Sequence, residues 1–302
     1  MTYDVAIIGA GPAGLSAAIY AQRAGFNTIC FEANVHGGQI INTPEVENYP
    51  ALGKVSGVEY ATNICEQALG FGATIEYKSV SDVNLQGKIK EIKCGSESYT
   101  ARAVIIATGV VRRKLGCPGE EKFIGAGVSY CATCDGLFFK NKTAVVVGGG
   151  NTALEDAVYL AGICEKVYLI HRRDEFRGSK HEVEKVLSNP KIEILYDSVV
   201  LAVNGTGKVE SIVVKNLKTD KESTLSTSAV FIAVGLIPQN DMLKGKIKLT
   251  QDGYIDATED CHTDVEGVFV AGDTRNKTLR QLVTATADGA IAGTAAAMYL
   301  SR

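Results

Sequence analysis

The sequence predicts an α/β protein in which one βαβ module occurs twice, and in which the second copy interrupts the domain that the first copy begins. Residues 4–32 and 143–171 align without a gap. Each contains an apolar run rich in β-branched residues, a glycine turn, a segment with helical periodicity and a second apolar run. A shorter echo comes after each module, because residues 103–109 and 229–235 both have the pattern of a buried strand that ends at a glycine. Chance is a poor explanation for such self-similarity, so we interpret the chain as two copies of one module.

The order strand, turn, helix, strand is half of a Rossmann-like dinucleotide-binding fold, and we expect both copies to have its three-layer ββα form. After the second copy, residues 267–273 supply another strand that ends in a glycine turn, and residues 282–300 have helical character. This tail completes the first copy, so the first domain is discontinuous. The expected ranges are 1–114 and 245–302 for the first domain and 115–244 for the inserted one, with crossings near 112–119 and 238–248.

Length and charge narrow the function classes. A chain of 302 residues fits two domains. The formal net charge is only −3 and no long block of like charge is present, so neither nucleic acid nor a membrane surface is an expected partner. No apolar run is long enough to cross a bilayer, and the first residues lack the basic start of a secretion signal. We therefore expect a soluble, cytoplasmic protein.

The first glycine turn has the G-x-G-x-x-G pattern, with Gly9, Gly11 and Gly14 between a predicted strand and a predicted helix. The first glycine permits a tight turn, the second lets the backbone approach a pyrophosphate, and the third lets the helix pack against the strand. The helix N-terminus offers partial positive charge and free N–H groups to the phosphates. Glu32 ends the second strand, where a carboxylate can accept hydrogen bonds from ribose hydroxyls.

The second turn is a G-x-G-x-x-A variant, which reads Gly148-Gly149-Gly150-Asn151-Thr152-Ala153. His171 stands at the position that aligns with Glu32. Three arginines come after it, namely Arg172, Arg173 and Arg177. A carboxylate there would repel the 2′-phosphate of NADP, whereas guanidinium groups bind it through charge-assisted hydrogen bonds. The first site is therefore predicted to take a nucleotide with a free ribose and the second to take NADP, with a solvated basic face as the plainer alternative for the arginines.

The eight cysteines fall into two classes. Six are scattered and are expected to be structural thiols: Cys30, Cys65, Cys94, Cys117, Cys164 and Cys261. Cys131 and Cys134 form the only C-x-x-C pair, which has three interpretations: a redox dithiol, half of a zinc site, or coincidence. Zinc needs two more ligands at suitable spacing, and the four histidines are isolated, which favours the dithiol. Asp135 comes directly after the pair and can hold or release a proton, although an exposed turn carboxylate would give the same pattern.

Taken together, the motifs resemble those of the low-molecular-weight thioredoxin reductases over essentially the whole chain. The C-x-x-C inside the inserted module distinguishes this group from glutathione reductase-like enzymes, which carry theirs near the N-terminus. The matching motifs are GAGPAG at 9–14, GGQI at 37–40, ENYP at 47–50, ATG at 107–109, CATCDG at 131–136, GGGNTALEDA at 148–157, HRRDEFR at 171–177, AGD at 271–273 and RQLVTATADGAIAG at 280–293.

This resemblance implies two cofactors, a homodimer and a cytoplasmic location. It implies that FAD is held in the first domain by Gly9, Gly11, Pro12, Ala13, Gly14, Glu32, Gly37, Gly38, Gln39, Ile40, Asn48, Thr108, Gly109, Gly272, Asp273, Arg280, Gln281 and Leu282. It implies that NADPH is held in the inserted domain by Gly148, Gly150, Asn151, Thr152, His171, Arg172, Arg173 and Arg177. No metal is implied.

The implied reaction runs from NADPH to FAD, then to the Cys131–Cys134 disulfide, and then to the disulfide of thioredoxin or a thioredoxin-like protein. By the same resemblance, Cys134 lies nearer the flavin, Cys131 attacks the partner, and Asp135 is the acid that protonates the departing thiolate. The dithiol and the NADP motif lie in the same inserted module, and both must reach a flavin held by the other domain. We therefore expect that module to adopt two orientations about the crossings.

One departure and three rivals remain. Relatives often have Asp after the triple glycine, where this chain has Asn151, but Asn also suits a helix start. A dithiol oxidase on the same scaffold would not need the three arginines. A peroxide-system reductase usually carries an extra N-terminal domain, which a flavin motif starting at Gly9 does not accommodate. A nucleotide-sensing or electron-carrying flavoprotein would use the C-x-x-C as a structural zinc site.

Overall fold

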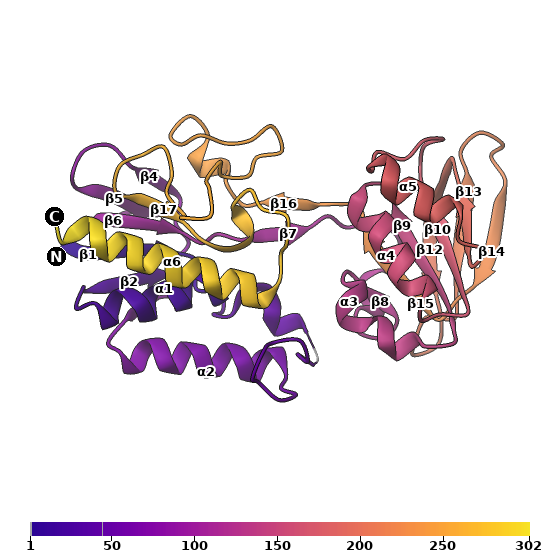
Figure 1. Ribbon diagram of the computed structural model, residues 1–302, viewed down its shortest axis with the longest axis horizontal. Helices are drawn as coiled ribbons and strands as arrows, with labels where there is room; N and C mark the ends of the chain where they lie inside the picture. Colours follow the sequence, from indigo (N-terminus) through magenta and orange to yellow (C-terminus); the bar gives the residue numbers. More distant parts are fainter. Residues whose placement is uncertain (1, 44) are drawn as a thin grey trace. The chain divides into compact units, whose positions relative to one another are not determined.

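The chain forms two compact units in a computed structural model that describes residues 2–43 and 45–302 (Figure 1). The first unit contains the chain up to Val111 together with Ile237–Arg302, and the second unit is Arg112–Leu236. The chain passes between them inside two short strands, β7 (Val110–Arg112) and β16 (Leu236–Pro238), which pair with each other. The sequence predicts these boundaries after residues 114 and 244, whereas the units divide after Val111 and after Leu236. Stretches rich in charge, glycine or proline attract a boundary prediction, and three-residue strands give little signal.

The first unit is built on a mixed seven-stranded sheet. Parallel pairing joins β1 to β2 and β6, β2 to β3, and β17 to β6. The long strand β6 also pairs antiparallel with β5 through its first half, and β5 pairs antiparallel with β4. The strands are β1 (Thr2–Ile8), β2 (Thr28–Phe31), β3 (Thr74–Glu76), β4 (Asp82–Asn84), β5 (Lys90–Cys94), β6 (Glu97–Ile106) and β17 (Val268–Val270).

Helices cover one face of the parallel strands (Figure 1). The β4–β5 hairpin, which continues the sheet from the first half of β6, packs against part of the other face, so the first unit has three layers. The helices are α1 (Pro12–Arg23), α2 (Gly57–Gly70) and α6 (Leu282–Leu300), with 3-10 turns η1 (Gly38–Asn42), η4 (Asp241–Leu243) and η5 (Gly272–Thr274). Helix α6 packs closely on α1, because a Cβ at Gly289 or Gly293 would lie 2.2 or 2.5 Å from a backbone oxygen of α1. Among the described residues, no helix is long and apolar enough to cross a membrane.

The second unit repeats the three-layer arrangement. Its parallel sheet has the order β11-β10-β9-β15-β8, and a separate antiparallel sheet has the order β12-β13-β14. The strands are β8 (Val128–Ser129), β9 (Thr143–Gly148), β10 (Lys166–Ile170), β11 (Ile192–Leu195), β12 (Ser198–Asn204), β13 (Ser211–Asn216), β14 (Glu222–Ser226) and β15 (Ala229–Ala233). The helices are α3 (Ala132–Asp135), α4 (Asn151–Ala161) and α5 (Lys180–Leu187), with 3-10 turns η2 (Glu121–Phe123) and η3 (Gly136–Phe139). Apolar clusters fill both faces of the parallel sheet.

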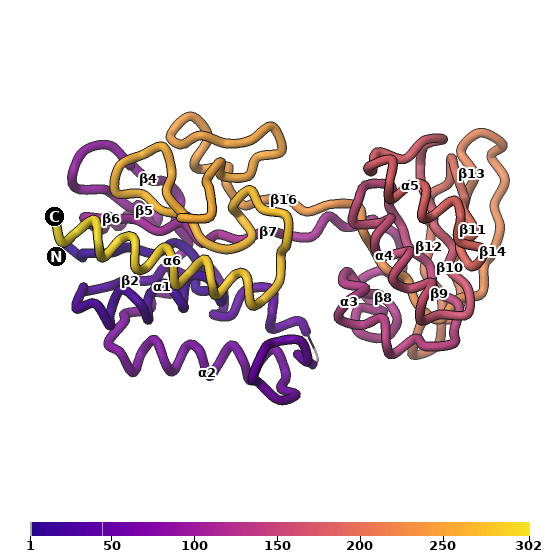
Figure 2. The backbone as a smooth tube through the Cα atoms, viewed as in Figure 1, coloured from indigo at the N-terminus to yellow at the C-terminus, as the bar shows by residue number. Residues whose placement is uncertain are grey.

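The two predicted modules are therefore β1-α1-β2 and β9-α4-β10, and the predicted α/β fold class is confirmed. The structure adds one equivalence that the sequence does not reveal. Strand β17 pairs with β6 in the first unit as β8 pairs with β15 in the second. The segment after each of these strands consequently emerges at the same edge of its sheet. In the first unit it leads into α6, which lies along α1, and in the second it leads into α3, which lies against α4 (Figure 2).

Candidate active site and nucleotide-binding turns

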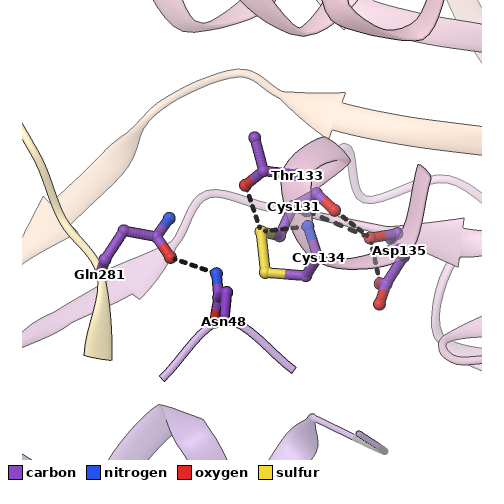
Figure 3. Close-up of a disulfide and its surroundings, with 7 residues drawn as sticks. Asn48, Cys131, Thr133, Cys134, Asp135 and Gln281 are labelled. Carbon is purple, nitrogen blue, oxygen red and sulfur yellow. Dashed lines mark hydrogen bonds between the residues drawn. A yellow bond between two sulfur atoms is a disulfide. The ribbon is translucent and has the colours of Figure 1, made fainter. Parts of the chain in front are cut away.

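The C-x-x-C pair lies at the start of α3, directly after β8. Cys131 and Cys134 are joined by a disulfide, with their Cα atoms 5.3 Å apart. Cys131 is the residue that caps α3, and its Sγ accepts a hydrogen bond from the backbone N–H of Cys134 at 3.2 Å. The hydroxyl of Thr133 lies 3.4 Å from the same sulfur (Figure 3). The start of α3 therefore places a backbone N–H donor against the sulfur of Cys131.

Asp135 is held beside the pair by a serine that was not predicted from the sequence. The hydroxyl of Ser129 donates to Oδ2 of Asp135 at 2.6 Å and accepts from the backbone N–H of Cys131 at 3.1 Å. Asp135 is half-buried, and its backbone N–H donates to the carbonyl of Cys131. One buried hydroxyl thus connects the carboxylate to the first cysteine. The only sequence signal was a serine at the end of an apolar strand, immediately before the motif.

Two large apolar side chains beside the dithiol were also missed. Leu137 and Phe138 come after α3 and are 60% and 54% exposed. Exposed apolar side chains of this size, next to a reactive group, are typical of a surface that contacts another molecule. The pattern Leu-Phe-Phe after an acidic turn was the available signal.

The remaining cysteines have the character of structural thiols. Five are buried and Cys117 is half-buried, and all six are free. Burial raises the pKa of the Cys30 thiol to about 12, with the neighbouring Cys65 adding to the shift. Burial likewise raises the pKa of Cys261 to about 12. These groups stay protonated at neutral pH, which makes them poor nucleophiles.

The first glycine turn is sterically closed at two positions and open at one. A Cβ at Gly9, where φ is +107°, would lie 2.3 Å from the carbonyl oxygen of Ala107, and one at Gly14 would lie 1.9 Å from the carbonyl oxygen of Gly9. At Gly11 the nearest atoms would be the Cα of Gly38 at 3.9 Å and the carbonyl oxygen of Gly37 at 4.0 Å. The turn at Gly11 therefore faces the turn at Gly37 and Gly38, and no side chain of the described residues fills the space between them. Helix α1 begins at Pro12 without a side-chain cap.

Several of the other predicted FAD residues of the first unit form hydrogen bonds with one another or with a neighbouring residue. The hydroxyl of Thr108 donates to the Thr274 hydroxyl at 3.0 Å, next to Asp273. Arg280 donates to the backbone oxygen of Asp273 at 3.3 Å and lies over the ring of Tyr254. The side-chain amide of Asn48 donates to Gln281 at 3.1 Å, as the close-up shows (Figure 3). Gly109 lies between β6 and β7, Gly272 begins η5, and Gln281 and Leu282 lie at the start of α6. Gly37 precedes η1 as its cap, and Gly38, Gln39 and Ile40 are inside that turn.

The second turn has the same steric pattern at its first two glycine positions, and its third position is Ala153. A Cβ at Gly148 would lie 2.4 Å from the carbonyl oxygen of Ala233, whereas a Cβ at Gly150 would meet nothing within 4 Å. Helix α4 begins at Asn151, again without a side-chain cap on its free N–H groups. Both turns therefore fit the pyrophosphate of a dinucleotide, which needs close backbone approach and uncapped N–H donors.

His171 behaves differently from its neighbours. Its ring is 4% exposed and packs against Gly149, where an added Cβ would lie 2.2 Å from ring atoms. Burial is the largest influence on the pKa of His171 and lowers it. A hydrogen bond to the backbone oxygen of Glu175 opposes this shift, and the charges of the three nearby arginines lower the pKa further. The side chain therefore forms the floor of the turn as a neutral ring, a placement that alignment with Glu32 could not reveal.

The arginines of this site are exposed. Arg172, Arg173 and Arg177 all reach solvent, and across residues 2–43 and 45–302 none of the three forms an ion pair with a carboxylate. The backbone N–H of Arg177 donates to the carbonyl of Gly149 at 2.7 Å, which ties the arginine loop to the glycine turn. The arrangement leaves three exposed cationic groups on the loop that is tied to the glycine turn.

Two dinucleotide folds and a disulfide at a helix start define an oxidoreductase that exchanges electrons between nucleotide cofactors and thiols. The chain belongs to the pyridine nucleotide-disulphide oxidoreductase family, whose pattern matches residues 3–289. Membership implies a flavin and a pyridine nucleotide as cofactors.

Relatives and solved structures agree with this assignment. The chain is 48% identical to a thioredoxin reductase of Peptoclostridium acidaminophilum, over 99% of this chain and 97% of the relative. It is 40% identical to a thioredoxin reductase structure from Giardia duodenalis, with a TM-score of 0.95 and coverage of 100% and 99%. A thioredoxin reductase structure from Streptococcus pyogenes gives 40% identity, a TM-score of 0.93 and coverage of 99% and 98%. The resemblance drawn from the motifs is confirmed.

Proposed function

We propose that this chain reduces the disulfide of thioredoxin or of a thioredoxin-like protein, with electrons that pass from NADPH through FAD to the Cys131–Cys134 pair. The observation that carries the proposal is the disulfide at the start of α3, in the unit that also holds the arginine loop. The names of the relatives support it, since each is a thioredoxin reductase that matches nearly the whole chain.

The cofactors are assigned to the units by the residues at the two turns. FAD is proposed for the first unit, where Glu32 can accept from a free ribose and where Thr108, Asp273 and Gln281 lie along the same edge. NADPH is proposed for the second unit, because Arg172 and Arg173 suit a 2′-phosphate. Bound FAD would accept a hydride equivalent from NADPH and deliver two electrons to the disulfide, which is chemistry that the side chains cannot supply.

The cysteines then perform the exchange with the partner. The Cys131 thiolate attacks one sulfur of the partner's disulfide, so that a mixed disulfide forms and the partner's other sulfur leaves as a thiolate that takes up a proton. The Cys134 thiolate next attacks the sulfur of Cys131, which releases the second partner sulfur and restores the Cys131–Cys134 disulfide. NADPH, one proton and the partner's disulfide are consumed, and NADP⁺ and the partner's dithiol are formed.

Asp135 is the proposed proton donor to the departing thiolate. Its Oδ2 receives a hydrogen bond from Ser129, which leaves the other carboxyl oxygen for proton exchange. Leu137 and Phe138 supply apolar contact for a protein substrate next to Cys131. The order of the motifs along the chain supports a hinge at the two crossings, since nucleotide and dithiol both serve one flavin.

We further propose a cytoplasmic homodimer. The six free thiols suit a reducing compartment. A groove of about 460 Å³ along α6 is mostly apolar, and its wall includes exposed Ile291 and Met298. That face of the first unit offers the kind of surface that a second copy would cover. Sedimentation measurements would report the assembly.

The test is a coupled assay with purified flavoprotein and candidate thioredoxins, with NADPH and NADH run in parallel. Thioredoxin-dependent NADPH oxidation that vanishes when the partner's cysteines are replaced is the expected result. Oxygen consumption driven by a dithiol substrate in the absence of NADPH, with no thioredoxin-dependent NADPH oxidation, would instead support the dithiol oxidase.

A further inference from the structure

Tyr130 occupies the single position between β8 and the first cysteine of the pair. Its hydroxyl donates to Oε1 of Glu120 at 2.7 Å. The guanidinium carbon of Arg112 lies 5.2 Å from the centroid of its ring, which is within the range of a cation–π contact. The side chain of Tyr130 is therefore held at its hydroxyl and at its ring face, whereas the side chain of the preceding Ser129 bonds to Asp135.

Glu120 is a buried carboxylate, 1% exposed, and it accepts three hydrogen bonds. Besides Tyr130, it receives the backbone N–H groups of Leu115 at 2.9 Å and Gly116 at 2.7 Å. Desolvation of a carboxylate is costly unless such donors compensate it, so these contacts are all needed to keep Glu120 inside. Burial, followed by the contact with Glu120, raises the pKa of the Tyr130 phenol far above neutrality, so it remains a donor.

These hydrogen bonds join the segment after the first crossing to the segment that carries the dithiol. Leu115 and Gly116 belong to the stretch that leaves the first crossing at Arg112. The same stretch is fixed to the body of the unit by Pro118, whose carbonyl accepts from the N–H of Val203 at 2.9 Å. Tyr130 leads directly into Cys131. The network therefore connects the crossing segment to the residue that precedes the attacking sulfur.

We infer that Tyr130 is a positioning residue for the dithiol. Its hydrogen bond to Glu120 fixes the segment that carries Cys131 against the chain that leaves the crossing, and so sets how Cys131 meets a partner's disulfide. The inference rests on the proposed function. Tyr130 acts through Cys131, and its hydroxyl is committed to Glu120 rather than to the sulfur.

The main test is Tyr130→Phe in the flavin-loaded enzyme, which keeps the ring under Arg112 and removes only the hydroxyl. The kcat for reduction of the thioredoxin partner should fall about 3- to 10-fold, the range expected for loss of one neutral-donor hydrogen bond. The KM for NADPH and the stopped-flow rate of flavin reduction by NADPH should stay at their wild-type values. Tyr168→Phe is the matched control, because its hydroxyl accepts from Lys166 at 3.0 Å in the same unit without touching this network.

Glu120→Gln is the partner variant on the other side of the same hydrogen bond. It keeps one oxygen for the Tyr130 hydroxyl but turns an NH2 group towards the backbone N–H of Gly116, so it should lower the partner kcat at least as far as Tyr130→Phe does. Equal kcat values for Tyr130→Phe and Tyr168→Phe would overturn the inference. So would a fall in kcat that is matched by an equal fall in the rate of flavin reduction, because that pattern indicates general loosening of the unit.

A partner-free measurement separates this inference from the proposed function. In a Cys134→Ser background reduced with dithiothreitol, the rate of alkylation of Cys131 by iodoacetamide reports how often its sulfur is exposed. Adding Tyr130→Phe should raise that rate, since a segment released from Glu120 is less restrained. A rate unchanged by Tyr130→Phe would contradict the positioning role even if no thioredoxin substrate is found, whereas absence of partner reduction by the wild-type enzyme would count only against the proposed function.

Discussion

The two glycine turns share a backbone frame and differ in the residues that stand after the second strand of each module. After β2 stands Glu32, whose carboxylate accepts from the N–H groups of Ala10 and Asn34, each at 3.0 Å. After β10 stands His171, whose ring is buried under the turn while the arginines beyond it stay exposed. The comparison teaches that the two units share the backbone of the glycine turn and differ in one short segment, which under the proposed function would select the ribose of each dinucleotide.

The sheet edges differ as well. In the first unit the segment after β17 runs into the long helix α6, which packs on α1 through Gly289 and Gly293. In the second unit the segment after β8 carries the disulfide and the short helix α3. The dithiol therefore occupies, in its own unit, the position that the AGD loop occupies in the other. Under the proposed function, the first unit would hold FAD at this edge, whereas the second unit carries its disulfide there.

The largest expected effect tests whether the thiol chemistry depends on the segment after β8 in the second unit. Cys131→Ser or Cys134→Ser should lower thioredoxin reduction at least about 10³-fold, as loss of a nucleophile typically does. The flavin should stay bound and should still be reduced by NADPH in stopped flow. Cys117→Ser, at a half-buried free thiol of the same unit, is the control and should keep full turnover. Wild-type turnover in both single variants would contradict the assignment of Cys131 and Cys134 as the redox pair.

The next effect tests nucleotide choice at the second turn. Arg172→Ala and Arg173→Ala should each lower kcat/KM for NADPH roughly 10- to 150-fold, which corresponds to about 1.5–3 kcal/mol for a charge-assisted hydrogen bond. Activity with NADH should change little. Arg23→Ala, at the exposed end of α1, provides a matched loss of charge in the other module. Equal losses with NADH and NADPH would mean that the arginines support the fold rather than bind the phosphate.

A smaller effect is expected at the aligned position of the first turn. Glu32→Ala removes the acceptor for two backbone N–H groups and for the ribose, so the dissociation constant of FAD should rise about tenfold. Titration of apoprotein with FAD, followed by flavin fluorescence, measures it. The KM for NADPH should not move. A parallel change in both would show that the two turns do not act independently.

The smallest effect concerns the helices that come after the turns. Ala17 of α1 is fully buried, and the aligned residue of α4 is Asp156, a half-buried carboxyl group. Burial, with a contribution from Glu155, raises the pKa of Asp156 to about 7. The unfolded chain ionises Asp156 at a lower pH than the folded chain does, so this residue costs stability as pH rises from about 4 towards 7.

Asp156→Asn should therefore stabilise the protein at pH 8 by about 1 kcal/mol, after allowance for partial exposure, and should have little effect at pH 4.5. Thermal unfolding of both proteins at the two pH values measures the difference. Glu155→Gln, at the exposed neighbouring position, is the control. A larger gain at pH 4.5 than at pH 8 would contradict the assignment.

Most of the fold could be predicted from periodicity. Helical character is predicted over 282–300, and α6 spans Leu282–Leu300 because its small residues pack against α1 and its start is set by a capping box. Both modules could be recognised from their glycine spacing, because backbone contacts exclude a Cβ at Gly9, Gly14 and Gly148. The crossings were harder to predict, because β7 and β16 are held by pairing with each other and not by local propensity.

The site was predictable where residue type alone dictates chemistry. The C-x-x-C pair was predicted as a redox dithiol and forms a disulfide, whereas the arginine cluster as the site of the 2′-phosphate stays a prediction. Ser129, Tyr130 and Glu120 were not singled out, because their roles depend on hydrogen bonds between segments that only folding brings together. The burial of His171 was hidden for the same reason, since it depends on the absence of a side chain at Gly149.

The pairing of β7 with β16 has a consequence for how the molecule can be divided. The N–H of Arg113 donates to the carbonyl of Gly235 at 3.0 Å, so the two ends of the second unit lie side by side. Adjacent ends are the condition under which a domain can be cut out or transplanted without stretching its host. The second unit, which carries the dithiol and the second glycine turn, therefore meets this condition. Excision of residues 112–236, with a short glycine bridge from Val111 to Ile237, should leave a flavin-binding protein that has lost its thiol chemistry. The excised unit should in turn fold when it is inserted into another host protein.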